Sequence, residues 1–187
     1  QKNYKALENY SNVLCLQPSE GILACDEIGI GKIPSNDLIQ LAIEFILCQK
    51  QKDFCKDLIN KEFLVTGGCT SEKIDAARNI TNNSSGTMGL LLSQVARFRG
   101  AKVQYIHGTL KVNKHITEGI KRYPIETSFE LIQKIKEEVS KCDYFIMNAA
   151  VSDIRISSDT SAKIPKRQIQ DFLNNNLELV PDILSDI

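Results

Sequence analysis

Apolar positions between residues 62 and 150 follow two spacings, one typical of strands and one typical of helices. Short apolar or alternating runs predict four strands, at residues 63–65, 102–106, 120–123 and 143–148. Helical spacing of apolar residues occupies two intervals between them, 88–98 and 127–139. Because strands and helices alternate, we expect an α/β fold, a Rossmann-like parallel sheet with right-handed crossovers and flanking helices.

Both predicted helices carry signals at one end. Gly100 follows the first helix, and Gly is favoured just past a helix C-terminus. Thr127 and Glu130 form a capping-box pattern at the start of the second. The apolar face of the first helix consists of Leu91, Leu92, Val95 and Phe98. That of the second consists of Leu131, Ile135 and Val139.

The first 48 residues predict a separate, smaller unit. Residues 12–16 form an apolar run that suits a buried strand, and residues 18–34, with three glycines, are expected to form a loop. Ser35-Asn36-Asp37 can cap the helix that follows. Its apolar face consists of Leu38, Leu41, Ala42, Phe45 and Ile46. Residues 49–61 are polar and charged, so we interpret them as a linker to a second unit at 62–187.

Composition narrows the functional classes. Lys+Arg and Asp+Glu balance at 23 each in 187 residues, which gives no general electrostatic reason to bind nucleic acid or an anionic membrane. Six cysteines without a CxxC pair, and two histidines, argue against a zinc site and for reduced cytosolic thiols. No apolar run reaches spanning length and no signal peptide is visible. We therefore expect a cytoplasmic enzyme or domain without membrane or nucleic-acid partners.

The most informative stretch runs from the first strand of the second unit to the first helix. The strand leads into Gly67-Gly68, a long polar loop follows, and then residues 82–86 (Asn-Asn-Ser-Ser-Gly) open the helix. Unpaired backbone N–H groups and the helix dipole attract anions at such a position. Asn and Ser are also ordinary helix caps, but capping needs one such residue and this run is longer. The pattern therefore favours a phosphate or carboxylate site.

Polar and small residues follow other strand ends as well. Ligands of parallel sheets lie beyond the carboxyl ends of the strands, where we expect Gly67, Asn82 and residues 149–153 to converge. The small Ala149 and Ala150 would allow a ligand close to the backbone, and Asp153 could contact a nucleotide or a magnesium–phosphate unit. A lone Asp here could instead form an Asx-turn.

The order of these motifs resembles a known family. Gly67-Gly68-x-Thr70-x-Glu72-x-Ile74-Asp75, Arg78 and Ile80-x-Asn82-x-Ser84-Ser85-Gly86-x-Met88-Gly89 are similar to the start of phosphopantothenoylcysteine synthetase. In bacteria that enzyme is usually the C-terminal half of a bifunctional protein of coenzyme A biosynthesis. The N-terminal half of such proteins is a flavin-dependent phosphopantothenoylcysteine decarboxylase. Ala149-Ala150-Val151-x-Asp153, Lys163-x-x-Lys166 and Pro181-Asp182-Ile183 continue the resemblance.

The resemblance implies roles for individual residues of the synthetase part. Asn82 would polarise the activated acyl group as a neutral amide, with Arg78 and Ala150 near the acyl substrate. Lys163 would be the catalytic lysine over the nucleotide phosphates, where an ammonium meets rising negative charge. The residues implied in nucleotide or phosphate binding are Gly67, Ser84, Ser85, Gly86, Met147, Asn148, Ala149, Asp153, Lys163, Lys166, Pro181 and Asp182. Outside the family, Arg78 could be a surface ion-pair partner, and the lysines solvated surface.

Residues 21–32 resemble the end of the decarboxylase, a flap over its substrate. Cys25 would then be the acid that protonates the enethiolate left when carbon dioxide departs, because a thiol pKa lies within reach of neutrality. Without the resemblance, a free Cys is more often a buried small hydrophobe. Residues 1–48 would thus be the C-terminal tail of a flavodoxin-like decarboxylase domain, 62–187 the N-terminal part of the ligase domain, and the chain a piece of the whole protein.

This chain departs from the family at four positions. Asp26 replaces a glycine beside the acid, Thr87 stands where most relatives have Lys, Pro165 stiffens the lysine segment and Val180 replaces a polar residue. The lost charge at Thr87 weakens the expected phosphate site.

The implied whole-protein activity has two steps. CTP, with Mg²⁺, activates 4′-phosphopantothenate as an acyl-cytidylate that L-cysteine attacks, and an FMN-dependent decarboxylation follows. Homo-oligomerisation is expected, and the metal ligands stay unassigned. Alone, these 187 residues are expected to bind nucleotide weakly or not at all.

Two alternatives remain open at this point. The strand and Gly-Gly turn would suit an NAD(P)-dependent reductase. However, the chain lacks the GxGxxG motif of such enzymes, and it has His107-Gly108 where their second strand ends in an acidic residue. A degenerate, assembly-only subunit would explain the departures at Asp26, Thr87 and Val180.

Overall fold

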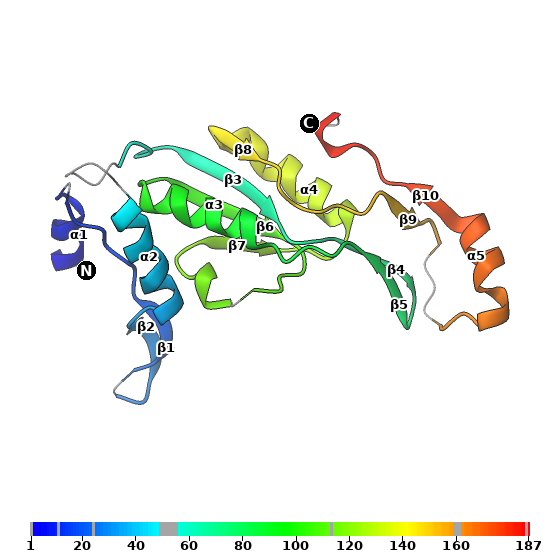
Figure 1. Cartoon of the computed structure of the whole chain (residues 1–187), viewed down its shortest axis with the longest axis horizontal. Helices are drawn as coiled ribbons and strands as arrows, with labels where there is room; N and C mark the ends of the chain where they lie inside the picture. Colours follow the sequence, from blue (N-terminus) through cyan, green and yellow to red (C-terminus); the bar gives the residue numbers. More distant parts are fainter. Residues whose placement is uncertain are drawn as a thin grey trace.

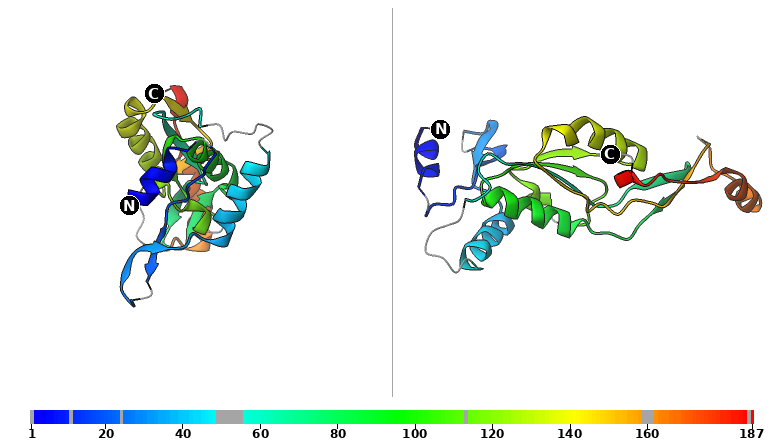
Figure 2. Two further views of the ribbon diagram at one scale, coloured as in Figure 1. Left: turned by 90° about the vertical axis from the view of Figure 1, so that its left-hand side faces the viewer. Right: turned by 90° about the horizontal axis from the view of Figure 1, so that it is seen from above.

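The computed structural model describes residues 2–10, 12–23, 25–48, 56–112, 114–158, 162–185 and 187. The molecule is elongated (Figures 1 and 2), with an α/β body in the middle, the N-terminal segment at one end and a projecting hairpin with a small helical unit at the other. Within the described residues, no helix is long and apolar enough to cross a membrane.

The body is built on a four-stranded, all-parallel sheet in the order β7-β6-β3-β8. Its strands are β3 (Glu62–Gly67), β6 (Lys102–His107), β7 (Lys121–Pro124) and β8 (Tyr144–Ile146). The predicted parallel sheet is therefore confirmed. The expected strand at 143–148 is wrong in its length, because the backbone N–H groups of Asn148 and Ala149 donate to the Thr66 hydroxyl (2.9 and 3.1 Å) instead of continuing the ladder.

Helices α3 (Thr87–Phe98) and α4 (Ser128–Glu138) cover opposite faces of the sheet (Figure 1). Successive residues of a strand point to opposite faces. Thus Phe63 and Val65 pack in the cluster with Leu90 of α3, whereas Leu64 packs in the cluster with Leu131 of α4. Each face of the sheet thereby has its own core.

The signals at the helix ends are confirmed. After α3, Gly100 has a φ of +96°, and the N–H groups of Gly100 and Ala101 donate to Arg97 O (2.9 Å) and Ala96 O (3.0 Å), a Schellman motif. Before α4, Thr127 Oγ1 accepts from Glu130 N (3.2 Å). The predicted face of α3 is partly wrong: Leu90, Ala96 and Phe98 are buried, while Leu91, Leu92 and Val95 are only half-buried.

The polar loop expected after Gly68 is instead a β-hairpin of β4 (Ser71–Asp75) and β5 (Arg78–Thr81). Its inward residues are charged rather than apolar: Glu72 and Asp75 are buried, so hydrophobic periodicity gave no strand signal. The Glu72 carboxylate accepts from the backbone N–H of Ser128 at 2.7 Å, which ties the hairpin to the start of α4.

The N-terminal segment comprises α1 (Lys2–Glu8), β1 (Ser19–Ile22), β2 (Ile28–Lys32) and α2 (Asn36–Cys48). The helix predicted after Ser35 is confirmed, with Ser35 Oγ accepting from Leu38 N at 3.3 Å. Two other predictions here are wrong. Residues 12–16 form no strand in the described part, because they pack their leucines on α2 and Phe98 without a neighbouring strand. The expected loop at 18–34 contains the β1–β2 hairpin.

After β8 the chain forms β9 (Ile154–Ile156), which pairs antiparallel with β10 (Leu177–Leu179). Between them lie a 3-10 turn (Lys166–Gln168) and helix α5 (Ile169–Asn176). Further 3-10 turns occur at Lys114–Thr117, Val139–Lys141 and Ile183–Ser185. The strand β3 begins at Glu62, where the second unit is predicted to start, and residues 49–55 of the predicted linker lie outside the described residues.

Candidate functional site

The segments that follow three strands meet at the carboxyl edge of the sheet. Ala150 N donates to Gly68 O (2.8 Å), and Thr70 N donates back to Ala150 O (3.2 Å). On the other side, Cys69 and Thr109 exchange backbone hydrogen bonds of 3.3 and 3.0 Å. The junction is thus a continuous backbone layer beyond β3, β6 and β8, at the place where parallel sheets bind ligands.

Glycines let this layer close tightly on the start of α3. A Cβ on Gly67 would come within 2.2 Å of the Tyr105 hydroxyl oxygen, and one on Gly89 within 2.7 Å of Thr66 O. Gly86, the N-cap of α3, has a φ of +77°, in the left-handed region that favours glycine. The buried Tyr105 hydroxyl donates to Gly86 O at 3.3 Å, so it supports the turn from below.

The hydroxyls of the serine pair lie against the start of α3. Ser84 Oγ accepts from Gly86 N, and Ser85 Oγ accepts from Thr87 N, both at 3.3 Å, which is long for a hydrogen bond. The N-cap residue itself is Gly86, which has no side chain to cap with. The Ser85 and Thr87 hydroxyl oxygens lie 2.7 Å apart. The serine hydroxyls therefore make local contacts at the mouth of the helix, and Thr87 contacts Ser85.

Asn82 joins the serine loop to the turn after β8. Its side-chain Nδ2 donates to Val151 O at 2.7 Å, and Ser152 N donates to Thr70 Oγ1 at 2.9 Å. The expected convergence of Gly67, Asn82 and residues 149–153 is therefore present in the structure. Ala149 and Ala150 are half-buried within the same junction.

Several residues expected at the nucleotide line one open cavity of about 310 Å³. Met147, Asp153, Pro181 and Asp182 are among its walls, together with Ser152. Val180 N donates to Asp153 O at 2.9 Å, which brings the 180–183 segment beside the turn after β8. Asn148 lies on the α3 side, with Oδ1 3.1 Å from the position of a Cβ on Gly89.

The lysine segment is anchored at the far end of the β4–β5 hairpin. Ile164 N donates to Asp75 Oδ2 at 3.0 Å, and Arg78 Nη2 donates to Ile164 O at 2.8 Å. Lys163 and Lys166 flank this anchor and are exposed. Arg78 and Asn82 are four residues apart along an extended chain, roughly 13 Å. The structure thus places Lys163 with Arg78 rather than beside the serine pair.

Cys25 is exposed in the turn of the β1–β2 hairpin, at the opposite end of the molecule from β4–β5 (Figure 1). The neighbouring Asp26 has a φ of +61°, and its N–H donates to Leu23 O at 3.0 Å. A glycine, which the resemblance implies here, would adopt this left-handed conformation without strain. Cys25 is therefore separate from the junction at the carboxyl edge.

Two residues near the junction carried no sequence signal for a site. Lys111 donates through its backbone N–H to Ser85 O (3.0 Å) and through Nζ to Asn83 Oδ1 (2.7 Å), which places an amine beside the serine loop. His107 ends β6, and burial lowers its pKa, with a smaller lowering from the Arg122 charge and an opposing backbone hydrogen bond at Gly108. Both residues lie just beyond the strand that the sequence predicted at 102–106.

Metal binding has one partial candidate. Among the described residues, no three His, Cys, Asp or Glu side chains are grouped to hold an ion. Asp153 and Asp182 nevertheless border the same cavity. Mg²⁺ commonly takes one or two carboxylates and leaves its other positions to phosphates and water, so carboxylates are the right kind of ligand. The Asp182 carboxylate also accepts from Leu184 N (3.1 Å) and Ser185 Oγ (3.0 Å).

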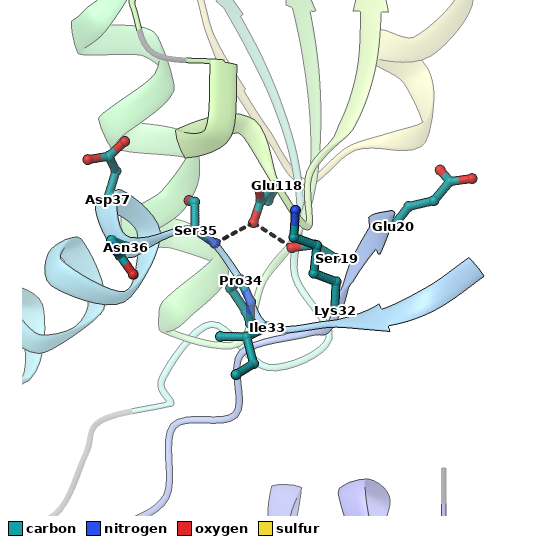
Figure 3. A pocket seen from close by; sticks show the side chains of 9 residues that line it. All are labelled: Ser19, Glu20, Lys32, Ile33, Pro34, Ser35, Asn36, Asp37 and Glu118. Carbon is teal, nitrogen blue, oxygen red and sulfur yellow. Dashed lines mark hydrogen bonds between the residues drawn. The ribbon is translucent and has the colours of Figure 1, made fainter. Parts of the chain in front are cut away.

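A second cavity, of about 760 Å³, lies between the N-terminal segment and the body (Figure 3). At its centre, Glu118 Oε2 accepts from Ser19 Oγ (2.6 Å) and from Ser35 N (3.1 Å). One carboxylate of the body thus holds both ends of the β1–β2 hairpin. No motif predicted these two contacts, because Ser19 lies 99 residues and Ser35 lies 83 residues before Glu118 in the sequence.

A parallel α/β sheet with helices on both faces and a glycine- and serine-lined junction at its carboxyl edge defines a Rossmann-like ligand-binding domain. Residues 58–187 match the model of the DNA/pantothenate metabolism flavoprotein C-terminal domain. The chain belongs to that family.

Relatives with curated names agree. The chain is 34% identical over 188 residues to the coenzyme A biosynthesis bifunctional protein CoaBC of Borreliella burgdorferi, covering 100% of this chain and 46% of that protein. It is 32% identical to the CoaBC protein of Haemophilus influenzae, covering 100% and 44%. The chain therefore spans about half the length of these relatives.

Solved structures give the same fold. The C-terminal domain of a CoaBC protein matches with a TM-score of 0.54 and 30% identity, over 69% of this chain and 58% of that one. The DNA/pantothenate metabolism flavoprotein from Streptococcus pneumoniae matches with a TM-score of 0.52 at 23% identity, over 67% and 62%, and shows the fold alone.

Proposed function

We propose that this chain contributes the phosphopantothenate–cysteine ligase part of a coenzyme A biosynthesis protein. The observation that carries the proposal is the contact of the Asn82 amide with Val151 O, next to a cavity bordered by Asp153 and Asp182. Membership of the DNA/pantothenate metabolism flavoprotein C-terminal family and the CoaBC relatives support the same reaction class.

The proposed chemistry begins with activation of a carboxylate. A carboxylate oxygen of 4′-phosphopantothenate attacks the α-phosphorus of CTP, pyrophosphate leaves, and an acyl-cytidylate forms. The amine of L-cysteine then attacks the acyl carbon, CMP leaves, and the amine loses a proton. Negative charge develops on phosphate oxygens in the first step and on the acyl oxygen in the second, and preorganised donors lower both barriers.

Each part of the site has a task in this proposal. The amides around Ser84, Ser85 and Gly86 would bind an anionic group at the start of α3. Asn82 would donate to the acyl oxygen, and a neutral amide does so without titrating near pH 7. Lys163 would approach the nucleotide phosphates from the hairpin side. Asp153 and Asp182 would share a Mg²⁺ ion with those phosphates.

The proposal for the whole protein includes a second reaction. FMN, when bound, would accept and return the two electrons that make loss of carbon dioxide possible. The exposed Cys25 thiol would give a proton to the resulting enethiolate. We propose a cytoplasmic homo-oligomer acting on small-molecule substrates, with CTP as co-substrate.

The test uses the full-length protein and measures CMP release that depends on both cysteine and 4′-phosphopantothenate. Asn82→Ala and Lys163→Ala are each expected to lower kcat at least about 100-fold, the usual loss for one oxyanion donor. Decarboxylation of supplied phosphopantothenoylcysteine should survive in both variants, because Cys25 is at the other end of the molecule.

Matched controls come from the same hairpin. Asn79 and Lys73 are exposed and opposite each other in the β4–β5 register. Asn79→Ala and Lys73→Ala should keep near-normal ligation. Normal ligation by folded Asn82→Ala and Lys163→Ala proteins would contradict the proposed site.

A further inference from the structure

A buried carboxylate connects the β4–β5 hairpin to the lysine segment. The Asp75 side chain is 0% exposed. Its Oδ1 accepts from Ala77 N at 2.8 Å, and its Oδ2 accepts from Ile164 N at 3.0 Å and from Arg78 Nε at 3.1 Å, with Arg78 Nη2 in further contact. A carboxylate without such donors would be costly to bury.

Arg78 completes the connection from the other side. Its Nη2 also donates to Ile164 O at 2.8 Å, so the Asp75–Arg78 pair holds both the N–H and the C=O of one residue. The Ile164 side chain is itself buried, at 9% exposure. Lys163 and Lys166, one position before and two positions after Ile164, are exposed.

The anchor matters because it ties an irregular segment to the hairpin. Residues 163–165 belong to no helix or strand, and the hydrogen bonds of Ile164 join it to residues 86 and 89 positions away. The Arg78 hydrogen bond, aided by the N–H groups of Ile164 and Ala77, holds the pKa of Asp75 well below its usual range against the effect of burial. The carboxylate is therefore charged, and the clamp complete, at any pH where the enzyme would work.

We propose that Asp75 is a positioning residue for the ligation reaction: through Arg78 and the Ile164 backbone it fixes where Lys163 enters the site. This inference rests on the proposed function. It also gives a part to Asp75 of the Ile74-Asp75 motif, whose carboxylate binds the Ile164 N–H. The hairpin then carries both elements of the reaction, Asn82 at one end of β5 and the lysine anchor at the other.

The first test needs no substrate. Hydrogen–deuterium exchange of the full-length protein reports on residues 162–168, where the Ile164 amide is donated to Asp75. Asp75→Asn puts an amide donor where a carboxylate accepted four N–H groups, so the Ile164 amide should exchange at least about 10-fold faster, as expected for loss of a charge-assisted bond. Arg78→Lys keeps the charge at a partly exposed position, and serves if Asp75→Asn fails to fold.

The matched control is Glu72→Gln. Glu72 is the other buried carboxylate of this hairpin, but its partner is Ser128 N at the start of α4. This control should speed exchange at 128–130 and leave Ile164 protected.

The second test is kinetic. Asp75→Asn should lower kcat for CMP release at least about 10-fold, and the Asp75→Asn, Lys163→Ala double variant should lose no more than Lys163→Ala alone, because both changes act through the same positioned amine. Unchanged Ile164 protection in both anchor variants, or fully additive effects with Lys163→Ala, would overturn the inference. A wild-type protein without ligase activity would overturn the proposed function instead, and the exchange result would still decide the anchor.

Discussion

At the scale of single residues, His107 is expected to make folding stability depend on pH near neutrality. Burial lowers its pKa from the ordinary value of 6.5, so just below that pH the unfolded chain binds more protons than the folded one. Stability should therefore fall as the pH is lowered through 6.5, and the loss should stop below the folded-state pKa. Urea unfolding of wild type and His107→Gln between pH 8 and 5 measures the difference.

His107→Gln removes this titration while keeping a neutral polar side chain. The stability difference between the two proteins should shrink or reverse as the pH falls. Parallel pH profiles for both proteins would show that His107 is equally protonated in the folded and unfolded states.

The sequence could predict the site residues that belong to a short continuous motif. Gly67 and the Ala149–Asp153 turn follow predicted strands, Asn82 begins the run that opens a predicted helix, and the structure joins them. Contacts between residues far apart in the sequence could not be predicted from such motifs. Asp75 acts on Ile164, 89 positions on, and no periodicity or propensity connects two such residues. The position of Lys163 beside the hairpin depends on the contacts of Ile164 with Asp75 and Arg78, so it was equally hidden.

At the scale of elements, hydrophobic spacing predicted the strands that pack in the apolar cores. It missed the hairpins, whose positions depend on polar contacts. The strands β3 and β6 lie between two apolar cores, which fixes their pattern in sequence. The β4–β5 hairpin buries Glu72 and Asp75 instead, and pairs Lys73 with Asn79. The sequence of such a hairpin therefore has the polar pattern of a loop. The β1–β2 hairpin was missed for a related reason, since its isoleucines Ile22, Ile28 and Ile30 are exposed.

The capping box of α4 gives a prediction at the element scale. Thr127 Oγ1 accepts from Glu130 N (3.2 Å), and the Glu130 carboxylate accepts from Glu126 N (2.7 Å). Thr127→Ala should lower the free energy of unfolding by about 1 kcal/mol, the usual value for an N-cap. Chemical denaturation measures it, with Ser140→Ala, an exposed serine past the end of α4, as a control expected within about 0.5 kcal/mol of wild type. Equal stability of the two variants would mean that the cap is not formed in solution.

At the scale of the whole molecule, an apolar cluster and the Glu118 carboxylate are among the contacts that join the N-terminal segment to the body. Leu38 and Ala42 of α2 pack with Phe98 of α3, and Glu118 holds Ser19 and Ser35 (Figure 3). Glu118→Ala should lower stability by about 1–3 kcal/mol, because two hydrogen bonds to a charged group are lost. It should also speed amide exchange at Ser35.

Glu118→Gln separates the hydrogen bonds from the charge. Its side-chain oxygen can still accept from both serines, so exchange at Ser35 should stay close to the wild-type rate. If Glu118→Ala also leaves that rate unchanged, the carboxylate does not hold the hairpin in solution.

The same contact has a practical consequence for protein engineering. Glu118 holds Ser19, at the start of β1, and Ser35, between β2 and α2, whereas the turn around Cys25 and Asp26 is exposed. A reporter peptide inserted after Asp26 would therefore lie in the exposed turn of a hairpin whose base is held by Glu118. Labelling there leaves the attachment to the domain core intact.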